Sequence, residues 1–251
     1  MTWRAALLVL AAMGTAFAAA PRNAPSGPEV AAIAAFSSAA PGAALPAGWR
    51  AVTLPRIPPA DLALVAEGAT TVLRVTSAAA AGSAVHAFTQ GLAPETLLRW
   101  RWKVDRTVAG ADLARRAGDD FAARVYVFFD LPLEELSFGE RVALRVARFL
   151  HGGDVPAAGI CYVWDNRHPA GTVAPNPYAP RIRTFVLRNA ADAAGRWTEE
   201  QRDIDKDFRA AFGPRTRATP RVTGIAAGND TDQTGERATA WFGDFVAEAR
   251  P

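Results

Sequence analysis

The fold class is decided by the stretch Leu98-Arg99-Trp100-Arg101-Trp102-Lys103-Val104. Apolar and cationic residues alternate strictly along these seven positions. Successive side chains of a β-strand point to opposite sides, so a period of two is typical of a strand with one buried face. We therefore expect Trp100 and Trp102 to lie in a core and the intervening Arg99, Arg101 and Lys103 to lie outside it.

Short apolar runs bounded by glycine and proline predict further strands along the chain. Their ranges are 63–66, 72–76, 84–88, 121–129, 159–166, 181–188, 222–227 and 239–246. Many short strands joined by such turns are typical of a β-sandwich or a jelly roll. The expected fold class is therefore mainly all-β, a jelly roll or β-sandwich with two helical insertions.

Two segments carry helical signals. Ser137 and Glu140 have the spacing of a capping box, which predicts a helix that ends at 152–153. A second helix is expected over 205–212, because apolar residues recur there every four positions and Gly213 follows.

The first residues have the pattern of an export signal. Arg4 precedes an apolar run over 5–13, and Ala16-Phe17-Ala18 has small residues where a signal peptidase requires them. We expect cleavage after Ala18, with an uncleaved anchor as the alternative. The expected organisation is a signal peptide at 1–18, a flexible arm at 19–35 and one β-sandwich domain at 36–251.

The bulk composition excludes some classes of partner. The formal net charge is +3 and the basic residues are dispersed, so nucleic-acid binding is not expected. No transmembrane segment is expected after processing, so the mature protein is predicted to be periplasmic or secreted. Cys161 is the one cysteine, which excludes an intrachain disulfide, and its apolar neighbours predict that it is buried.

Several motifs, in a fixed order, resemble a bacterial family catalogued as Domain of Unknown Function 3047. They are LRWRWKV (98–104), GDDFAARVYV (118–127), CYVWDN (161–166), NPY (176–178), RDIDKDFRAAFG (202–213) and DTDQTG (230–235). The resemblance spans roughly residues 36 to 246. It implies an exported protein without an established activity, and it supplies no catalytic residues. More loosely, the layout is similar to the jelly rolls of carbohydrate-binding modules, a likeness of fold that does not dictate function.

The alternating cations lead to a binding hypothesis. If the strands share one sheet, Arg and aromatic side chains would form a groove for a saccharide or an anionic molecule of the cell envelope, because guanidinium groups bind anions and rings offer flat apolar area. The residues expected to bind this ligand are Arg99, Arg101, Arg124, Tyr126, Trp164, Asp165, Asn166 and Arg183. The expected function is non-catalytic binding of a small molecule or glycan. The alternative is a solvated face whose cations pair with nearby carboxylates.

The loop at 230–235 has alternating oxygen side chains, as calcium loops do. Asp230 and Asp232 could hold a structural calcium, the one cofactor considered. The loop is not an EF-hand, because Trp241 stands where the bidentate glutamate would be. The alternative is a hairpin stabilised by Asx-turns.

Two other functions stay open. The first is a glycoside hydrolase or lyase, which requires two acid/base groups in one cleft. Its candidate residues are Asp120, Asp165, His168 and Asp232. No nucleophile elbow, zinc motif or phosphate loop accompanies them, so no catalytic residue is assigned. The second is a scaffold that docks a partner protein through Arg141, Arg145 and Arg148 of the first expected helix.

Overall fold

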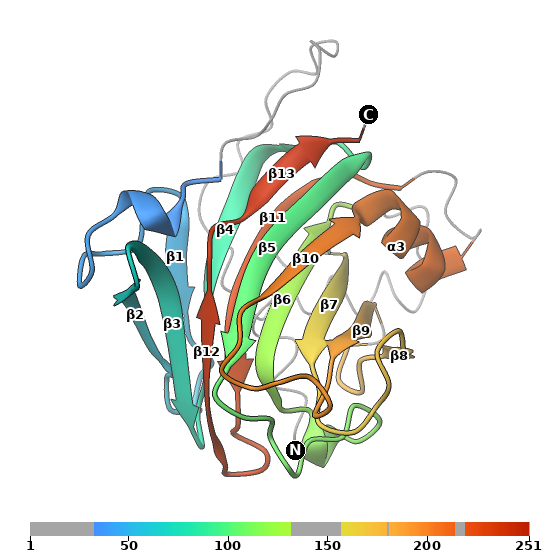
Figure 1. The fold of residues 1–251 in the computed structure, drawn as a ribbon. Coiled ribbons are helices and arrows are strands. Elements are labelled where there is room, and N and C mark those ends of the chain that lie inside the picture. Colours follow the sequence, from blue (N-terminus) through green and yellow to red (C-terminus); the bar gives the residue numbers. More distant parts are fainter. Residues whose placement is uncertain (1–32, 132–156, 180, 214–218, 251) are drawn as a thin grey trace.

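Two β-sheets packed face to face form the protein. We describe residues 33–131, 157–179, 181–213 and 219–250 of a computed structural model. Strands β5, β10 and β12 of one sheet lie over β6, β7 and β11 of the other (Figure 1). This arrangement confirms the expected β-sandwich.

Sheet A has seven strands in the order β1-β4-β11-β6-β7-β9-β8. Their bounds are β1 Trp49–Val52, β4 Ala81–Leu92, β6 Phe121–Phe129, β7 Ala158–Trp164, β8 Val173–Pro175, β9 Ile182–Arg188 and β11 Val222–Asp230. Neighbours are antiparallel except β7 and β9, which run parallel.

Sheet B has the order β10-β5-β12-β3-β2, and β13 also pairs with β5. The bounds are β2 Asp61–Glu67, β3 Thr70–Ala78, β5 Thr96–Val104, β10 Thr198–Asp203, β12 Arg237–Phe242 and β13 Val246–Ala249. Strand β5 thus has β10 along one edge and β12 followed by β13 along the other.

The alternation along β5 confirms the sequence prediction. Leu98, Trp100, Trp102 and Val104 are buried in the core between the sheets, whereas Arg99 is exposed. Trp102 is fully buried, and its ring lies 5.8 Å from that of Trp164 on the facing sheet. The indole NH of Trp102 also donates to Glu200 Oε1 at 3.0 Å. The two faces of this strand therefore separate the core from the outer surface of sheet B.

Sheet A differs from sheet B in that both of its faces are covered: the side chains of its central strand β6 are buried on both sides. Its inward residues, such as Val125 and Val127, belong to the core between the sheets. Its outward residues, such as Tyr126 and Phe128, belong to a second apolar cluster that Leu113 and Ala179 cover from neighbouring loops. Cys161 is buried in this second cluster, as expected.

One α-helix lies in the described part of the chain. Helix α3, Ile204–Phe212, confirms the expectation over 205–212. The Asp203 carboxylate caps it by accepting from the Lys206 backbone N–H at 3.1 Å, and Gly213 ends it with φ +67°. Short 3-10 turns occur at Phe36–Ser38 (η1) and Arg116–Gly118 (η2). The other expected helix and the signal peptide lie outside the described residues.

The sequence analysis did not predict all of the strands. Strands β1, β8 and β10 are short or polar edge strands without an apolar period. The run expected at 239–246 is interrupted: β12 ends at Phe242 and β13 begins at Val246. Among the described residues, no helix has the length and apolar composition needed to cross a membrane.

Trp102→Ala should lower the free energy of unfolding by about 3–5 kcal/mol, because it leaves a large cavity where both sheets meet. The exposed Arg99→Ala on the same strand is the control and should change it by less than about 0.5 kcal/mol. Urea unfolding of both variants measures the difference. A similar loss in the two would show that Trp102 does not hold the sheets together.

Candidate functional site

The interruption between β12 and β13 makes a pocket in the outer face of sheet B. Strand β12 pairs with residues 102–104 of β5 and β13 pairs with residues 96–99, so Trp100 and Arg101 lie opposite the break. Phe242 and Phe245 are both buried, a spacing of three that a regular strand cannot give. The irregular backbone between them therefore leaves a gap in the outer face of the sheet, where a continuous strand would have placed side chains.

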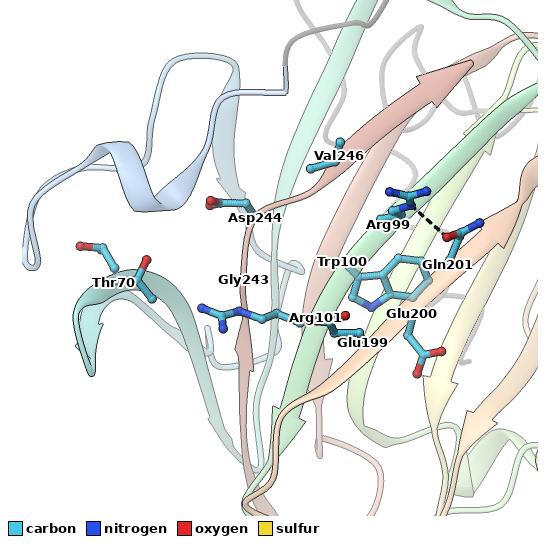
Figure 2. Close-up of a pocket in the computed structure, with 11 residues that line it drawn as sticks. Thr70, Arg99, Trp100, Arg101, Glu199, Glu200, Gln201, Gly243, Asp244 and Val246 are labelled. Atoms are coloured by element: carbon cyan, nitrogen blue, oxygen red, sulfur yellow. Dashed lines mark hydrogen bonds between the residues drawn. The ribbon is translucent and has the colours of Figure 1, made fainter. Parts of the chain in front are cut away.

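The pocket has a volume of about 550 Å³ (Figure 2). Its lining comes from the start of β3, from β5 and β10, and from the β12–β13 break with the first residue of β13. The residues are Thr70, Thr71, Arg99, Trp100, Arg101, Glu199, Glu200, Gln201, Gly243, Asp244 and Val246. We refer to this set as the sheet B pocket.

Arg101 crosses the break beside Gly243. Figure 2 shows its side chain extended toward the side of Thr70. A Cβ at position 243 would stand 2.6 Å from Arg101 Cγ and 2.7 Å from its Nε, closer than real contacts allow. The φ of Gly243 is not positive, so the backbone conformation does not require glycine there. Glycine is required at this position because the Arg101 side chain occupies the space that a Cβ would need.

Arg101 and its register partner Glu199 have no ion pair. They face each other across the β5–β10 ladder. Within the described chain, the Arg101 guanidinium lies 4.7 Å from the centre of the Trp197 ring, but the side chains of Arg101 and Glu199 make no hydrogen bond or salt bridge. Among the described residues, the pocket therefore holds a guanidinium and a carboxylate without an ion-pair partner.

The two neighbouring cations of β5 are paired, as the alternative to the binding hypothesis expected. Arg99 contacts Glu248 at 3.3 Å, and Lys103 forms a salt bridge with Glu67. Lys103 Nζ also lies over the rings of Trp197 and Trp241, at 5.1 and 4.8 Å. The Lys103 ammonium holds the pKa of the Glu67 carboxyl below its usual value. These contacts hold two half-buried indoles, Trp197 beside both Arg101 and Lys103, and Trp241 beside Lys103.

The expectation that all the cations share one groove is wrong. Arg99 and Arg101 belong to sheet B, whereas Arg124, Tyr126 and Arg183 belong to sheet A. Arg124 and Tyr126 are 3% and 2% exposed, because loops cover the outer face of sheet A. Arg183 Nε donates to the carbonyl of Ala211 in α3.

The remaining predicted ligand residues form contacts outside the sheet B pocket. Trp164 is buried in the core. The buried Asp165 carboxylate accepts from His168 Nδ1 at 2.8 Å and from two backbone N–H groups of its own turn. Asn166 donates to the Ala109 carbonyl at 2.7 Å. Of the eight residues predicted, the pocket contains two, Arg99 and Arg101.

Arg124 is the centre of a buried ionic network on sheet A. Its guanidinium contacts both Asp230 carboxylate oxygens at 2.7 Å and the Tyr126 hydroxyl at 3.1 Å. It also donates to the backbone carbonyl of Asp119. Asn176 Nδ2 donates to both carboxylate oxygens of Asp119, at 3.2 and 3.1 Å. The sequence alternation could not reveal this burial.

A group of carboxylates that could hold a divalent cation borders this network. One oxygen from each of Asp120, Asp230 and Asp232 lies within 4.8 Å of the other two. Asp120 accepts from the backbone N–H groups of Gln233 and Thr234, at 3.3 and 2.7 Å. Asp232 Oδ1 is buried and accepts no hydrogen bond. Carboxylate oxygens suit calcium, so the calcium site expected at Asp230 and Asp232 stays a prediction, with Asp120 as an added ligand.

Burial raises the pKa of the Asp119 and Asp230 carboxyls, and burial together with the nearby Asp120 raises the pKa of Asp232 from 3.8 to about 6. The Arg124 guanidinium opposes the shift at Asp232.

The residues of the hydrolase or lyase hypothesis form two pairs. Asp120 and Asp232 share the acidic group, and Asp165 contacts His168. None of the four lines the sheet B pocket. Among the described residues, these pairs therefore lie apart from the pocket that could hold a ligand.

Sequence reasoning missed several parts of the pocket and its border. Trp241 and Gly243 stand two apart in the run expected to be one strand, so their common outward face could have been inferred. Trp197 and Glu199 lie in a segment without an apolar period and gave no such signal. Asp244 lies in the same expected strand as Trp241, where alternation would have placed it on the inward face with Phe242.

Asp232→Asn should raise the melting temperature at pH 8. The folded state binds the Asp232 proton more tightly than the unfolded state does. The stability that this group contributes is therefore lost as the pH rises from about 4 to about 6, and it is absent at higher pH. The advantage of the variant should therefore shrink in acid. Thermal unfolding against pH measures it, with the exposed Asp61→Asn as control.

The calcium expectation is tested in the same assay. Calcium at pH 8 should raise the melting temperature of the wild type and not that of Asp232→Asn, because bound calcium would neutralise the group. If calcium has no effect on the wild type, the group is not a calcium site.

Comparison with solved structures finds similar chains at low sequence identity. The chain is 13% identical to a cellulose-induced protein, Cip1, with a TM-score of 0.39 over 80% of this chain and 91% of that one. It is 8% identical to Trichoderma harzianum endoglucanase 3 from family GH12, with a TM-score of 0.41 over 91% of this chain and 100% of that one.

An arabinose-bound GH51 α-L-arabinofuranosidase is 12% identical, with a TM-score of 0.36 over 85% of this chain. The chain spans 25% of that enzyme's length. No curated protein matches the chain. The family model for proteins of unknown function DUF3047 matches residues 47–246, and since this is most of the 251-residue chain, the protein belongs to that family.

Proposed function

We propose that the protein is an exported, non-catalytic saccharide-binding protein whose binding site is the sheet B pocket. The observation that carries the proposal is the Arg101 guanidinium, which makes no hydrogen bond or ion pair with another described residue, in a pocket lined with further polar groups. An unpaired guanidinium offers five N–H donors in a fixed plane. A ligand with several oxygen atoms would satisfy them.

The other lining groups suit a ligand with hydroxyls. Glu199 and Asp244 supply carboxylate acceptors, and Thr70 supplies a hydroxyl. The Ser37 backbone N–H and hydroxyl donate to Asp244 at 3.0 and 2.5 Å, which fixes this carboxylate at the pocket rim. A sugar hydroxyl can donate to a carboxylate and accept from a guanidinium at the same time.

Indole rings lie beside the polar groups. Trp197 lies against both Arg101 and Lys103, and Trp241 lies against Lys103. Half-buried rings present flat apolar area, which complements the C–H face of a sugar ring. The expected residence in the periplasm or outside the cell fits such a ligand, since saccharides of the envelope are found there.

Arg101→Ala should weaken glycan binding by about tenfold or more, because it removes charge-assisted hydrogen bonds from the pocket. Isothermal calorimetry against the best ligand of a glycan array measures the change. Arg74→Ala is the matched control, since Arg74 pairs with Asp61 on the same sheet and does not line the pocket. If no glycan binds the wild type, or if both variants bind like it, the proposal fails.

Gly243→Ala should weaken binding without removing any charged group. Its Cβ would displace the Arg101 side chain from the break. A double-mutant cycle measures whether the two act together. Adding Gly243→Ala to Arg101→Ala should cause little further loss, whereas additive losses would mean that Gly243 acts independently of Arg101.

A further inference from the structure

We infer that the sheet B pocket selects uncharged sugar units with neighbouring hydroxyl groups and discriminates against acidic ones. This inference rests on the proposed function and narrows its ligand class. It reverses the expectation of an anionic ligand, which was based on the cations of β5 without their partners.

Carboxylates around the pocket balance its cations. Arg99 is paired with Glu248, and Lys103 beside the pocket is paired with Glu67. Glu200 lines the pocket but contacts Arg188 Nε at 2.7 Å. Among the charged groups that line the pocket, those without an ion pair are therefore one cation, Arg101, and two carboxylates, Glu199 and Asp244.

Glu199 is the group that would oppose an acidic ligand. It is exposed, lines the pocket and makes no ion pair or side-chain hydrogen bond with another described residue. A carboxylate or sulfate attracted to Arg101 would enter near this negative charge. Like charges brought together at a binding site lower affinity, so the attraction to Arg101 is offset.

An uncharged diol meets the same groups without this conflict. The Arg101 N–H groups can donate to hydroxyl oxygens, and the Glu199 and Asp244 carboxylates can accept from hydroxyl protons. Both kinds of bond involve a charged protein group, which makes them stronger than bonds between neutral groups. A pocket with the Arg101 donors, the Glu199 acceptors and the remaining lone pairs of Asp244 therefore favours a ligand whose groups both donate and accept.

Matched polysaccharides test the inference on the whole mature chain. Dextran, mixed-linkage β-glucan, galactomannan and arabinoxylan are the neutral probes, and polygalacturonate and alginate are the acidic ones. We expect binding to at least one neutral probe, with a Kd that changes less than about twofold when ionic strength rises from about 0.01 to about 0.15 M. Binding to acidic probes alone, lost at the higher ionic strength, would overturn the inference and leave the proposed function intact.

Glu199→Gln gives a result of opposite sign for the two ligand classes. With a neutral ligand the variant should bind about five- to tenfold more weakly, because a charge-assisted acceptor becomes a neutral one. With an acidic ligand it should bind more tightly, because the repulsion is removed. Glu95→Gln, an exposed carboxylate before β5 that does not line the pocket, is the control.

The outcomes separate the two claims. No binding to any probe by the wild type would overturn both the proposed function and this inference. Binding of the wild type to an acidic probe and to none of the neutral probes would overturn the inference alone. Melting temperatures of the variants close to that of the wild type confirm that they are folded.

Discussion

The two-residue period of β5 is the constraint on which the sandwich and the pocket both depend. One face of the strand supplies Trp100 and Trp102 to the core, where Trp102 meets Trp164 of the opposite sheet. The other face carries Arg99, Arg101 and Lys103 at the surface of sheet B. A register shift of one residue would exchange these faces, placing guanidinium groups in the core and indoles in water. The same constraint thus fixes the packing of the sheets and the direction of Arg101.

Burial makes similar arginines chemically different. Arg124 is enclosed by loops and holds Asp230, Asp119 and Tyr126 in one network, so its charge stabilises the interior of the loop region. Arg101 makes no ion pair with a carboxylate of the described residues and contacts Trp197 at the edge of a pocket. Desolvation makes breaking a buried network costly, and an unpaired surface guanidinium is free to bind.

The sequence predicted local structure better than the site. The alternation of β5, the spacing of α3 and most apolar strands followed from patterns within single segments. The assignment of Arg124 to the same face as Arg101 failed, because the order of strands in a sheet depends on pairings between distant segments. Alternation along 121–129 indicated two faces but not that loops cover one of them. Asp230 and Asp232 were found from their spacing, whereas their neighbour Asp120 required the fold.

The contact between Ser37 and Asp244 joins residues that are 207 positions apart in the chain. Contacts of such separation form late, because the entropy of closing a long loop must first be overcome. The rim of the pocket therefore cannot be complete until the C-terminal strands have been synthesised. A chain that lacks these strands has no Asp244 for Ser37 to hold, so the rim of its pocket stays open.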